Sequence, residues 1–267
     1  MKIQSVGVIG AGTMGIGIAQ VAAMVGYKVQ LFDTKPGLVP KAITKIKNNL
    51  KKGVEKGKIK AEQVAASMEN ISATLSFRDI NADMVIEAVI EDLDIKIKLF
   101  NHIEDIVSPQ TLLCTNTSSI PVTKIAAGMK HPERLVGMHF FNPAPVMKLV
   151  ELIRGIATAQ ATVDAVHAVA IQIGKQPVEV AEAPGFVVNR ILVPMINEAV
   201  GILAEGLASA QDIDAAMKLG ANHPMGPLTL ADMIGLDVCL AVMDVFHQEF
   251  GDSKYRTHPL LRKYVRA

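Results

Sequence analysis

Residues 3–33 read IQSVGVIGAGTMGIGIAQVAAMVGYKVQLFD, and this stretch decides the fold. The apolar run IQSVGVIG predicts a strand that ends in glycine. From Thr13 to Val25 the apolar residues Ile16, Ala19 and Ala23 recur at helical spacing, and YKVQLF predicts a second strand. Strand, helix and strand within about 30 residues is the length of a βαβ unit.

The alternation continues through most of the chain. Further strands are predicted over residues 71–75, 84–89, 111–116, 135–140, 148–153 and 177–180, with helical patterns between most of them. Such alternation favours a mainly parallel sheet covered on both faces, an α/β fold of the Rossmann type. We therefore expect a nucleotide-binding domain over residues 1–183.

The pattern changes after the punctuated joint EAPG at residues 182–185, and everything beyond it predicts helix. Residues 184–267 are expected to form an all-helical domain. Residues 186–207 are apolar on nearly all sides, which predicts a helix buried all round. Ser209 followed by Asp212 predicts a capping box for the next helix, and Gly220 predicts its end.

Composition excludes several classes of protein. Half of the 267 residues are hydrophobic and a fifth are charged, as in a compact globular protein. The net charge of +1 provides no overall field toward nucleic acid or membrane, and neither partner is expected. Cys114 and Cys239 have no disulfide or metal spacing, so we expect free thiols, no metal site and a cytoplasmic location. No secretory signal or membrane span is predicted.

The first chemical motif is Gly10-Ala-Gly12-Thr-Met-Gly15, which matches G-x-G-x-x-G between the first strand and the first helix. In this context the glycines permit a tight turn, the approach of a pyrophosphate and close helix–strand packing. Asp33, at the end of the second strand, is placed to bind the ribose hydroxyls of an adenosine. A carboxylate there favours NAD(H) over NADP(H), although Lys35 weakens the preference. The predicted cofactor contacts are Gly10, Gly12, Thr13, Met14, Gly15 and Asp33.

A second group of polar residues follows two later strands, where ligands of a doubly wound sheet bind. His139 lies near the end of the predicted strand at 135–140. The segment TNTSSIP places Asn116, which we assign to the cofactor, and Ser118 at the same edge. The alternative for the serines is helix capping ahead of Pro121, and one of them is expected to cap. The alternative for His139 is a core histidine with its nitrogens satisfied.

Glu151 follows His139 by 12 residues, inside the apolar run KLVELI. A carboxylate in a strand core must be paired or hydrogen-bonded, because burying it alone is costly. His139 is a natural partner for it, as a base with its orienting acid. Spacing alone leaves open whether the two residues meet.

Together these segments carry a family resemblance. GAGTMGIGIAQVAA, VIEAVIEDLDIK, TNTSSI, GMHFFNPAPVMKLVE, PGFVVNR and LGANHPMGPLTLADMIGLD resemble the 3-hydroxyacyl-CoA dehydrogenase family, in order and over nearly the whole chain. The resemblance implies hydride transfer between NAD(H) and a short-chain (S)-3-hydroxyacyl-CoA, in a homodimer whose active site lies between the two domains.

The resemblance also implies roles for individual residues. His139 matches the catalytic base and Glu151 its carboxylate partner. Ser118 and Asn189 match the residues around the reacting substrate oxygen; without the family, Asn189 would be an interior polar residue satisfied by a neighbour. The further cofactor contacts implied by the resemblance are Glu91, Lys96 and Asn142.

Residues 41–60 contain eight lysines and one acid, Glu55. Ile43, Ile46 and Leu50 sit at helical spacing, so the lysines coat the outer face of a helix. This pattern is typical of a solvated helix face. It also suits a phosphate-bearing ligand such as coenzyme A. The resemblance favours the ligand and suggests Asn49 and Lys56 as substrate contacts.

The sequence leaves two other functions open. One is a dehydrogenase of the same architecture that acts on a sugar acid or another hydroxy acid without coenzyme A; the lysine-rich segment argues against it. The other is a non-catalytic NAD-binding protein, against which the spacing of His139 and Glu151 argues.

Overall fold

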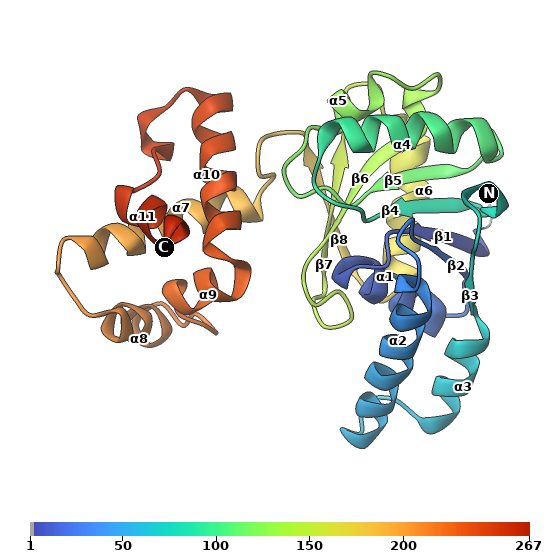
Figure 1. The fold of residues 1–267 in the computed structure, drawn as a ribbon, viewed down its shortest axis with the longest axis horizontal. Coiled ribbons are helices and arrows are strands. Elements are labelled where there is room, and N and C mark those ends of the chain that lie inside the picture. The colour runs from blue at the N-terminus through green and yellow to red at the C-terminus, as the bar shows by residue number, and fades with distance from the viewer. Residues whose placement is uncertain (1–2) are drawn as a thin grey trace. The chain divides into compact units, whose positions relative to one another are not determined.

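The computed structural model describes residues 3–267 and divides into two compact units. The first unit ends at Glu182, and the second comprises Ala183–Ala267. Each unit has its own hydrophobic core. Figure 1 shows the strands gathered in the first unit and helices alone in the second.

The described part of the first unit is built on an eight-stranded sheet in the order β3-β2-β1-β4-β5-β6-β7-β8. The strands are β1 Ser5–Ile9, β2 Lys28–Phe32, β3 Ile71–Ala73, β4 Met84–Glu87, β5 Leu112–Thr115, β6 Leu135–Phe140, β7 Leu149–Arg154 and β8 Gln176–Ala181. All neighbours pair in parallel except β6 and β7, which are antiparallel. The predicted Rossmann-type α/β fold is confirmed, and every predicted strand is present with its ends shifted by no more than two residues.

Helices cover both faces of this sheet. They are α1 Thr13–Met24, α2 Leu38–Glu55, α3 Ala61–Glu69, α4 Leu93–Ile106, α5 Val122–Ala126 and α6 Gln160–Gln172. Apolar residues of α1, α2 and α6 share one core with alternate strand residues such as Val8, Ile86 and Met138. The other face of the sheet meets α5: a Cβ at Gly137 of β6 would lie 3.0 Å from the Val122 side chain. Figure 1 shows α2 and α3 side by side, projecting away from the sheet.

The second unit contains α7 Val188–Ala204, α8 Ala210–Gly220, α9 Pro227–Ile234, α10 Leu236–Phe250 and α11 Pro259–Arg266. Its core is formed by α7, α9, α10 and α11 around Ile196, Met243 and Phe246. The Ser209 side chain accepts a hydrogen bond from the backbone N–H of Asp212, so the predicted cap of α8 is confirmed.

The expectation for α7 was wrong. This helix buries one face, including Val193, Ile196 and Val200, whereas Ile191 is 69% exposed. The sequence carries apolar residues all round, but the second unit supplies neighbours for only part of the circumference. An apolar pattern therefore shows which surface is able to be buried, and not which surface this chain buries by itself.

Two further features bear on the class of protein. Within residues 3–267, no helix combines the length and the hydropathy needed to cross a membrane. Cys114 and Cys239 are both buried and free of disulfide bonds. Burial raises the pKa of the Cys114 thiol, and it raises that of Cys239 to about 11, so neither is a reactive thiolate at neutral pH.

Candidate active site

The glycine-rich turn between β1 and α1 has the geometry of a pyrophosphate cradle. Gly10 has φ +108°, and a Cβ there would lie 2.4 Å from the carbonyl oxygen of Ala88. A Cβ at Gly15 would lie 1.8 Å from the carbonyl oxygen of Gly10. At Gly12, in contrast, a Cβ would meet no described protein atom within 4 Å. The fold itself needs Gly10 and Gly15, whereas the bare backbone at Gly12 leaves room for a ligand.

The start of α1 adds hydrogen-bond donors to this cradle. No described side chain caps its N-terminus, so the backbone N–H groups of the first turn, at Thr13 and Met14, point toward the open side of the turn. Such N–H groups and the helix dipole bind phosphates. The residues present therefore fit the pyrophosphate of a dinucleotide.

Asp33 links this turn to the end of β2. Its Oδ2 accepts a hydrogen bond from the Ala11 N–H at 2.8 Å, and its Oδ1 accepts one from the Lys35 N–H at 2.8 Å. The half-buried carboxylate is thereby fixed at the carboxyl edge of the sheet. Each oxygen keeps a further lone pair, so the group can still accept a bond from a ribose hydroxyl.

His139 and Glu151 are direct cross-strand neighbours on β6 and β7. His139 Nδ1 lies 2.8 Å from Glu151 Oε2, and both side chains are more than nine-tenths buried. The 12-residue interval is the length of this antiparallel hairpin, which places both side chains on one face of the sheet. A carboxylate can only accept, so Nδ1 carries the proton and Nε2 has the lone pair of a base. The pairing that spacing left open is present, and the catalytic roles stay a prediction.

The segment after β5 is organised by Glu91. Glu91 Oε1 accepts hydrogen bonds from the Thr117 hydroxyl and the Ser118 N–H at 2.7 Å, and from the Ser119 N–H at 3.0 Å. The expectation that a serine caps the following helix was wrong: Pro121 is the N-cap of α5, and it provides no side-chain cap. The free N–H groups of this turn are satisfied by a carboxylate from another loop instead.

Behind Glu91 lies a buried chain of charges. Lys96 Nζ lies 2.5 Å from Glu87 Oε1 and 3.4 Å from Glu91 Oε2, and the side chains of Lys96 and Glu87 are 1% and 0% exposed. Glu87 also accepts bonds from the Val89 N–H and the Thr115 hydroxyl, each at 2.7 Å. The ammonium of Lys96 is therefore occupied by two carboxylates inside the protein.

This arrangement controls the charge of Glu91. Burial raises the pKa of its carboxyl group, but the Lys96 ammonium and the hydrogen bonds from Thr117, Ser118 and Ser119 together lower it below its usual range. Glu91 thus remains ionised and keeps hold of the turn. Sequence reasoning missed Glu87, although a glutamate that ends an apolar strand nine residues before a helical lysine was a usable signal.

Two asparagines complete this edge of the sheet. Asn116 Oδ1 accepts a hydrogen bond at 2.9 Å from the Phe140 N–H, which ties the end of β5 to the end of β6. Asn142 is exposed in the turn after β6 and precedes a cis Pro143. The structure thus brings the predicted cofactor residues, apart from Lys96 on α4, to the carboxyl ends of β1, β2, β4, β5 and β6, with His139 on β6 and Glu151 beside it on β7.

A cavity of about 380 Å³ lies between α1, α2 and the turn after β6. Three lysines line it, Lys45, Lys52 and Lys58, together with Asn49, whose amide nitrogen donates to the Gln20 side chain at 3.3 Å. Lys56, predicted alongside Asn49, follows α2 and is not among the lining residues. Helical phase was a usable signal for Lys45, Asn49 and Lys52, which lie on one face of α2, whereas Lys58 reaches the cavity from the turn after the helix.

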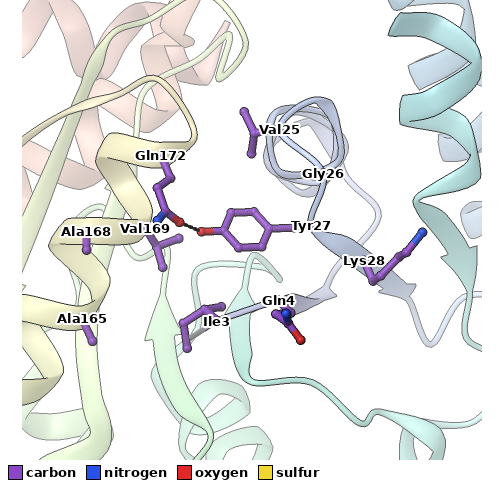
Figure 2. A pocket seen from close by; sticks show the side chains of 10 residues that line it. All are labelled: Ile3, Gln4, Val25, Gly26, Tyr27, Lys28, Ala165, Ala168, Val169 and Gln172. Carbon is purple, nitrogen blue, oxygen red and sulfur yellow. Dashed lines mark hydrogen bonds between the residues drawn. The ribbon is translucent and has the colours of Figure 1, made fainter. Parts of the chain in front are cut away.

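A second cavity, of about 1000 Å³, lies at the amino ends of β1 and β2, the edge opposite the glycine-rich turn. Figure 2 shows the Tyr27 hydroxyl pointing at Gln172, to which it is hydrogen-bonded. The hydroxyl of the buried Tyr27 therefore already has a partner in this cavity. Because ligands of such sheets bind at the carboxyl edge, this larger cavity is not the candidate site.

Asn189 belongs to the second unit, in the first turn of α7. Its neighbour Arg190 stacks 4.5 Å above the Phe250 ring and lies 3.4 Å from the Tyr255 hydroxyl. The preceding turn places Gly185 and Phe186 at positive φ. A Cβ at Gly185 would lie 2.2 Å from the Phe246 ring, so only glycine fits there. The start of α7 is thus held firmly within its own unit.

A Rossmann sheet with an open phosphate cradle, an acid after β2 and a histidine–glutamate pair at the carboxyl edge defines a nicotinamide-dependent dehydrogenase. Comparison with known proteins narrows the class. The model of the 3-hydroxyacyl-CoA dehydrogenase NAD binding domain matches residues 5–183, and that of the C-terminal domain of the same enzymes matches residues 185–267. The chain belongs to the 3-hydroxyacyl-CoA dehydrogenase family.

Individual relatives agree with this assignment. The chain is 52% identical to a 3-hydroxybutyryl-CoA dehydrogenase from Clostridioides difficile, over 97% of this chain and 93% of the relative. A crystal structure of (S)-3-hydroxybutyryl-CoA dehydrogenase from Ralstonia eutropha superposes with a TM-score of 0.96 at 49% identity, covering 99% and 94% of the two chains. The predicted family, cofactor NAD(H) and reaction class are confirmed.

A more distant structure shows how far the fold extends. A 5-formyl-3-hydroxy-2-methylpyridine 4-carboxylic acid 5-dehydrogenase is 32% identical with a TM-score of 0.76, covering 93% of this chain and 81% of that one. The substrate in the name of that enzyme is a pyridine carboxylic acid and not a coenzyme A thioester. The fold alone therefore does not determine the substrate.

Proposed function

We propose that this protein interconverts short-chain (S)-3-hydroxyacyl-CoA and 3-oxoacyl-CoA, with 3-hydroxybutyryl-CoA and acetoacetyl-CoA as the preferred pair. The observation that carries this proposal is the 2.8 Å contact between His139 and Glu151, on the two strands joined by the turn that lines the lysine-lined cavity. The names of the relatives, 3-hydroxybutyryl-CoA dehydrogenases, support a short acyl chain.

Side chains of this protein transfer the proton of the substrate hydroxyl. We assign its removal to Nε2 of His139, while Glu151 orients the ring through Nδ1 and stabilises the imidazolium that forms. General-base assistance of this kind contributes about 10²–10⁴-fold to the rate. The bound nicotinamide supplies the hydride acceptor. In the reverse direction the imidazolium returns the proton to the 3-oxo oxygen.

Ser118 is proposed to form hydrogen bonds to the reacting substrate oxygen and to the nicotinamide end of the cofactor. It follows β5 in the half of the fold that binds the second nucleotide, and the bonds to Glu91 hold its backbone. Glu91 and Asn142 are proposed as cofactor contacts. For Lys96 we propose an indirect role through Glu91, because its ammonium is buried against two carboxylates. Asn189 is proposed, from the resemblance alone, to bond the substrate.

The cavity lined by Lys45, Lys52 and Lys58 is proposed to bind the phosphates of coenzyme A. Lysine ammonium groups are point charges that suit phosphates in several orientations. Asn49 lines the same cavity, and its side chain is oriented by Gln20. Lys56 stays a weaker candidate, at the end of α2.

We propose a homodimer formed through the helical unit. Ile191, Leu219 and Met233 of this unit are 69%, 86% and 61% exposed, and a second copy of the chain would cover such apolar side chains. Sedimentation equilibrium tests this, with twice the chain mass expected. The buried free thiols suit the proposed cytoplasmic location.

A single assay tests the function. NADH oxidation is followed by absorbance with acetoacetyl-CoA, with free acetoacetate and with longer 3-oxoacyl-CoA thioesters. We expect a high kcat/KM for acetoacetyl-CoA and little activity on the free acid. Equal activity on the free acid would favour a non-CoA dehydrogenase, and absence of activity on every substrate would favour a binding protein.

A further inference from the structure

Lys175, in the turn that joins α6 to β8, is 8% exposed. None of the salt bridges among residues 3–267 involves its ammonium group. Burial, and then the nearby Lys148 ammonium, lower the pKa of Lys175. A buried cation is costly unless hydrogen bonds replace its water, so its partners matter to the structure.

Those partners are two carbonyl groups of one turn. Lys175 Nζ donates to the carbonyl oxygen of Ala144 and, at 2.8 Å, to that of Met147. The turn connects β6 to β7, and within it the Pro143 carbonyl accepts from the N–H groups of Val146 and Met147 at 2.9 and 3.0 Å. The ammonium therefore satisfies the carbonyl side of a helix-like turn, as cations do at helix C-termini.

The other side of the same turn forms a wall of the lysine-lined cavity. Its lining residues there are Pro143, Ala144, Pro145 and Val146. Helix α1 meets this wall at Gly17, where a Cβ would lie 2.9 Å from Ala144 Cβ and 3.1 Å from Pro145 Cδ. The turn is thus held between Lys175 and α1, and a displacement of the turn changes the width of the cavity.

We propose that Lys175 is a positioning residue for substrate binding: it fixes the turn at 143–147 and thereby sets the affinity for the coenzyme A part of the substrate, which it does not touch. This inference rests on the proposed function, because it takes the cavity between α1 and α2 as the place where coenzyme A binds. It explains why an ammonium is buried against carbonyls on a hairpin whose strands carry His139 and Glu151.

The test compares two thioesters of the same acyl group. Acetoacetyl-CoA carries the phosphates and adenosine, whereas acetoacetyl-N-acetylcysteamine carries neither. Lys175→Met keeps the aliphatic stem and removes the donors. We expect it to lower kcat/KM for acetoacetyl-CoA roughly tenfold, mainly through KM, while kcat/KM for the truncated thioester and the Kd for NADH change less than about twofold.

Lys148→Met is the matched control, because it removes the same charge from the exposed end of the same hairpin turn. If it raises KM for acetoacetyl-CoA as much as Lys175→Met does, the effect is charge and not position, and the inference is wrong. Gly17→Ala keeps both lysines and presses on the turn from α1. It should reproduce the selective loss if Lys175→Met does not fold, and unchanged selectivity in Gly17→Ala would then overturn the inference.

The outcomes separate this inference from the proposed function. If the wild-type protein uses both thioesters with the same kcat/KM, the cavity does not bind coenzyme A and the proposed function of the cavity fails. If the wild type prefers the coenzyme A thioester and Lys175→Met keeps that preference, the positioning role alone fails. If Lys175→Met lowers kcat/KM equally for both thioesters, the preference is also kept, and the positioning role fails.

Discussion

Two regions of the first unit carry charge in different ways. At the carboxyl ends of β4 and β6, Glu87, Lys96, His139 and Glu151 are almost wholly buried, and each is held by a short contact to a partner. On α2 and just after it, Lys45, Lys52 and Lys58 are exposed around a cavity. No salt bridge among residues 3–267 involves these three lysines.

The difference separates two tasks. A buried, paired charge has one position, so it can define the geometry of a reaction, and its loss leaves an uncompensated partner in a medium of low polarity. An exposed charge attracts an anion from solution but is screened by salt and defines no geometry. We therefore expect changes in the buried group to act on kcat, and changes in the exposed group to act on KM.

The largest effect is expected at His139. His139→Gln should lower kcat by about 10²–10⁴-fold because the base is lost, while the protein still binds NADH. Glu151→Gln should also lower kcat strongly, since the imidazolium loses its counter-charge. The double variant should be little worse than His139→Gln, because residues that act as a unit are not additive. Steady-state kcat values for the four proteins decide this, and additive losses would show that the two residues work independently.

Lys96→Met tests the buried chain behind Ser118. Loss of the ammonium releases Glu91 from one partner, and we expect kcat to fall by roughly tenfold to a hundredfold as the Ser118 turn shifts. Because Lys96 lowers the pKa of Glu91, its removal raises that pKa. Glu91 is then protonated at a higher pH on acidification, so the acid limb of the kcat profile should move to higher pH.

The matched control for this variant is Lys98→Met, on the exposed side of the same helix. It should leave both kcat and the acid limb unchanged. A lower melting temperature for Lys96→Met without a change in the pH profile would make Lys96 a purely structural residue.

Asp33 is half-buried, so its exposure is intermediate between that of the buried charges and that of the exposed lysines. Asp33→Ser should raise the KM for NADH about tenfold and narrow the gap to NADPH, because the carboxylate that bonds the ribose and repels a 2′-phosphate is gone. Initial rates with both cofactors measure the change. A wild-type preference for NADPH would contradict the role assigned to Asp33.

The smallest effect is expected from the exposed lysines. Lys52→Ala should raise the KM for acetoacetyl-CoA roughly two- to fivefold at low salt and less at high salt, with kcat unchanged. Lys47→Ala, on the same helix but away from the cavity, is the control. If Lys56→Ala raises the KM for acetoacetyl-CoA more than Lys52→Ala does, coenzyme A lies along the end of α2 and not in the cavity.

Much of the architecture was predictable because it depends on local periodicity. The run SVGVI, the glycines at 10, 12 and 15 and the acid at 33 lie within one βαβ unit, whose connection follows from chain length and handedness. The helical second unit was equally predictable, since apolar spacing and the Ser209 cap are local signals. The burial of α7 was not, because it depends on how many neighbours surround the helix.

The candidate site divides in the same way. The sequence by itself determined which residue types reach the carboxyl edge of the sheet, because parallel strands align their ends there, and its motifs determined the family. Only the tertiary structure decided that His139 meets Glu151 across a hairpin, that Glu91 and not a serine satisfies the turn before α5, and that Lys96 and Lys175 are buried. Those contacts join residues far apart along the chain or on different elements, and their formation depends on register and side-chain packing, which no local pattern encodes.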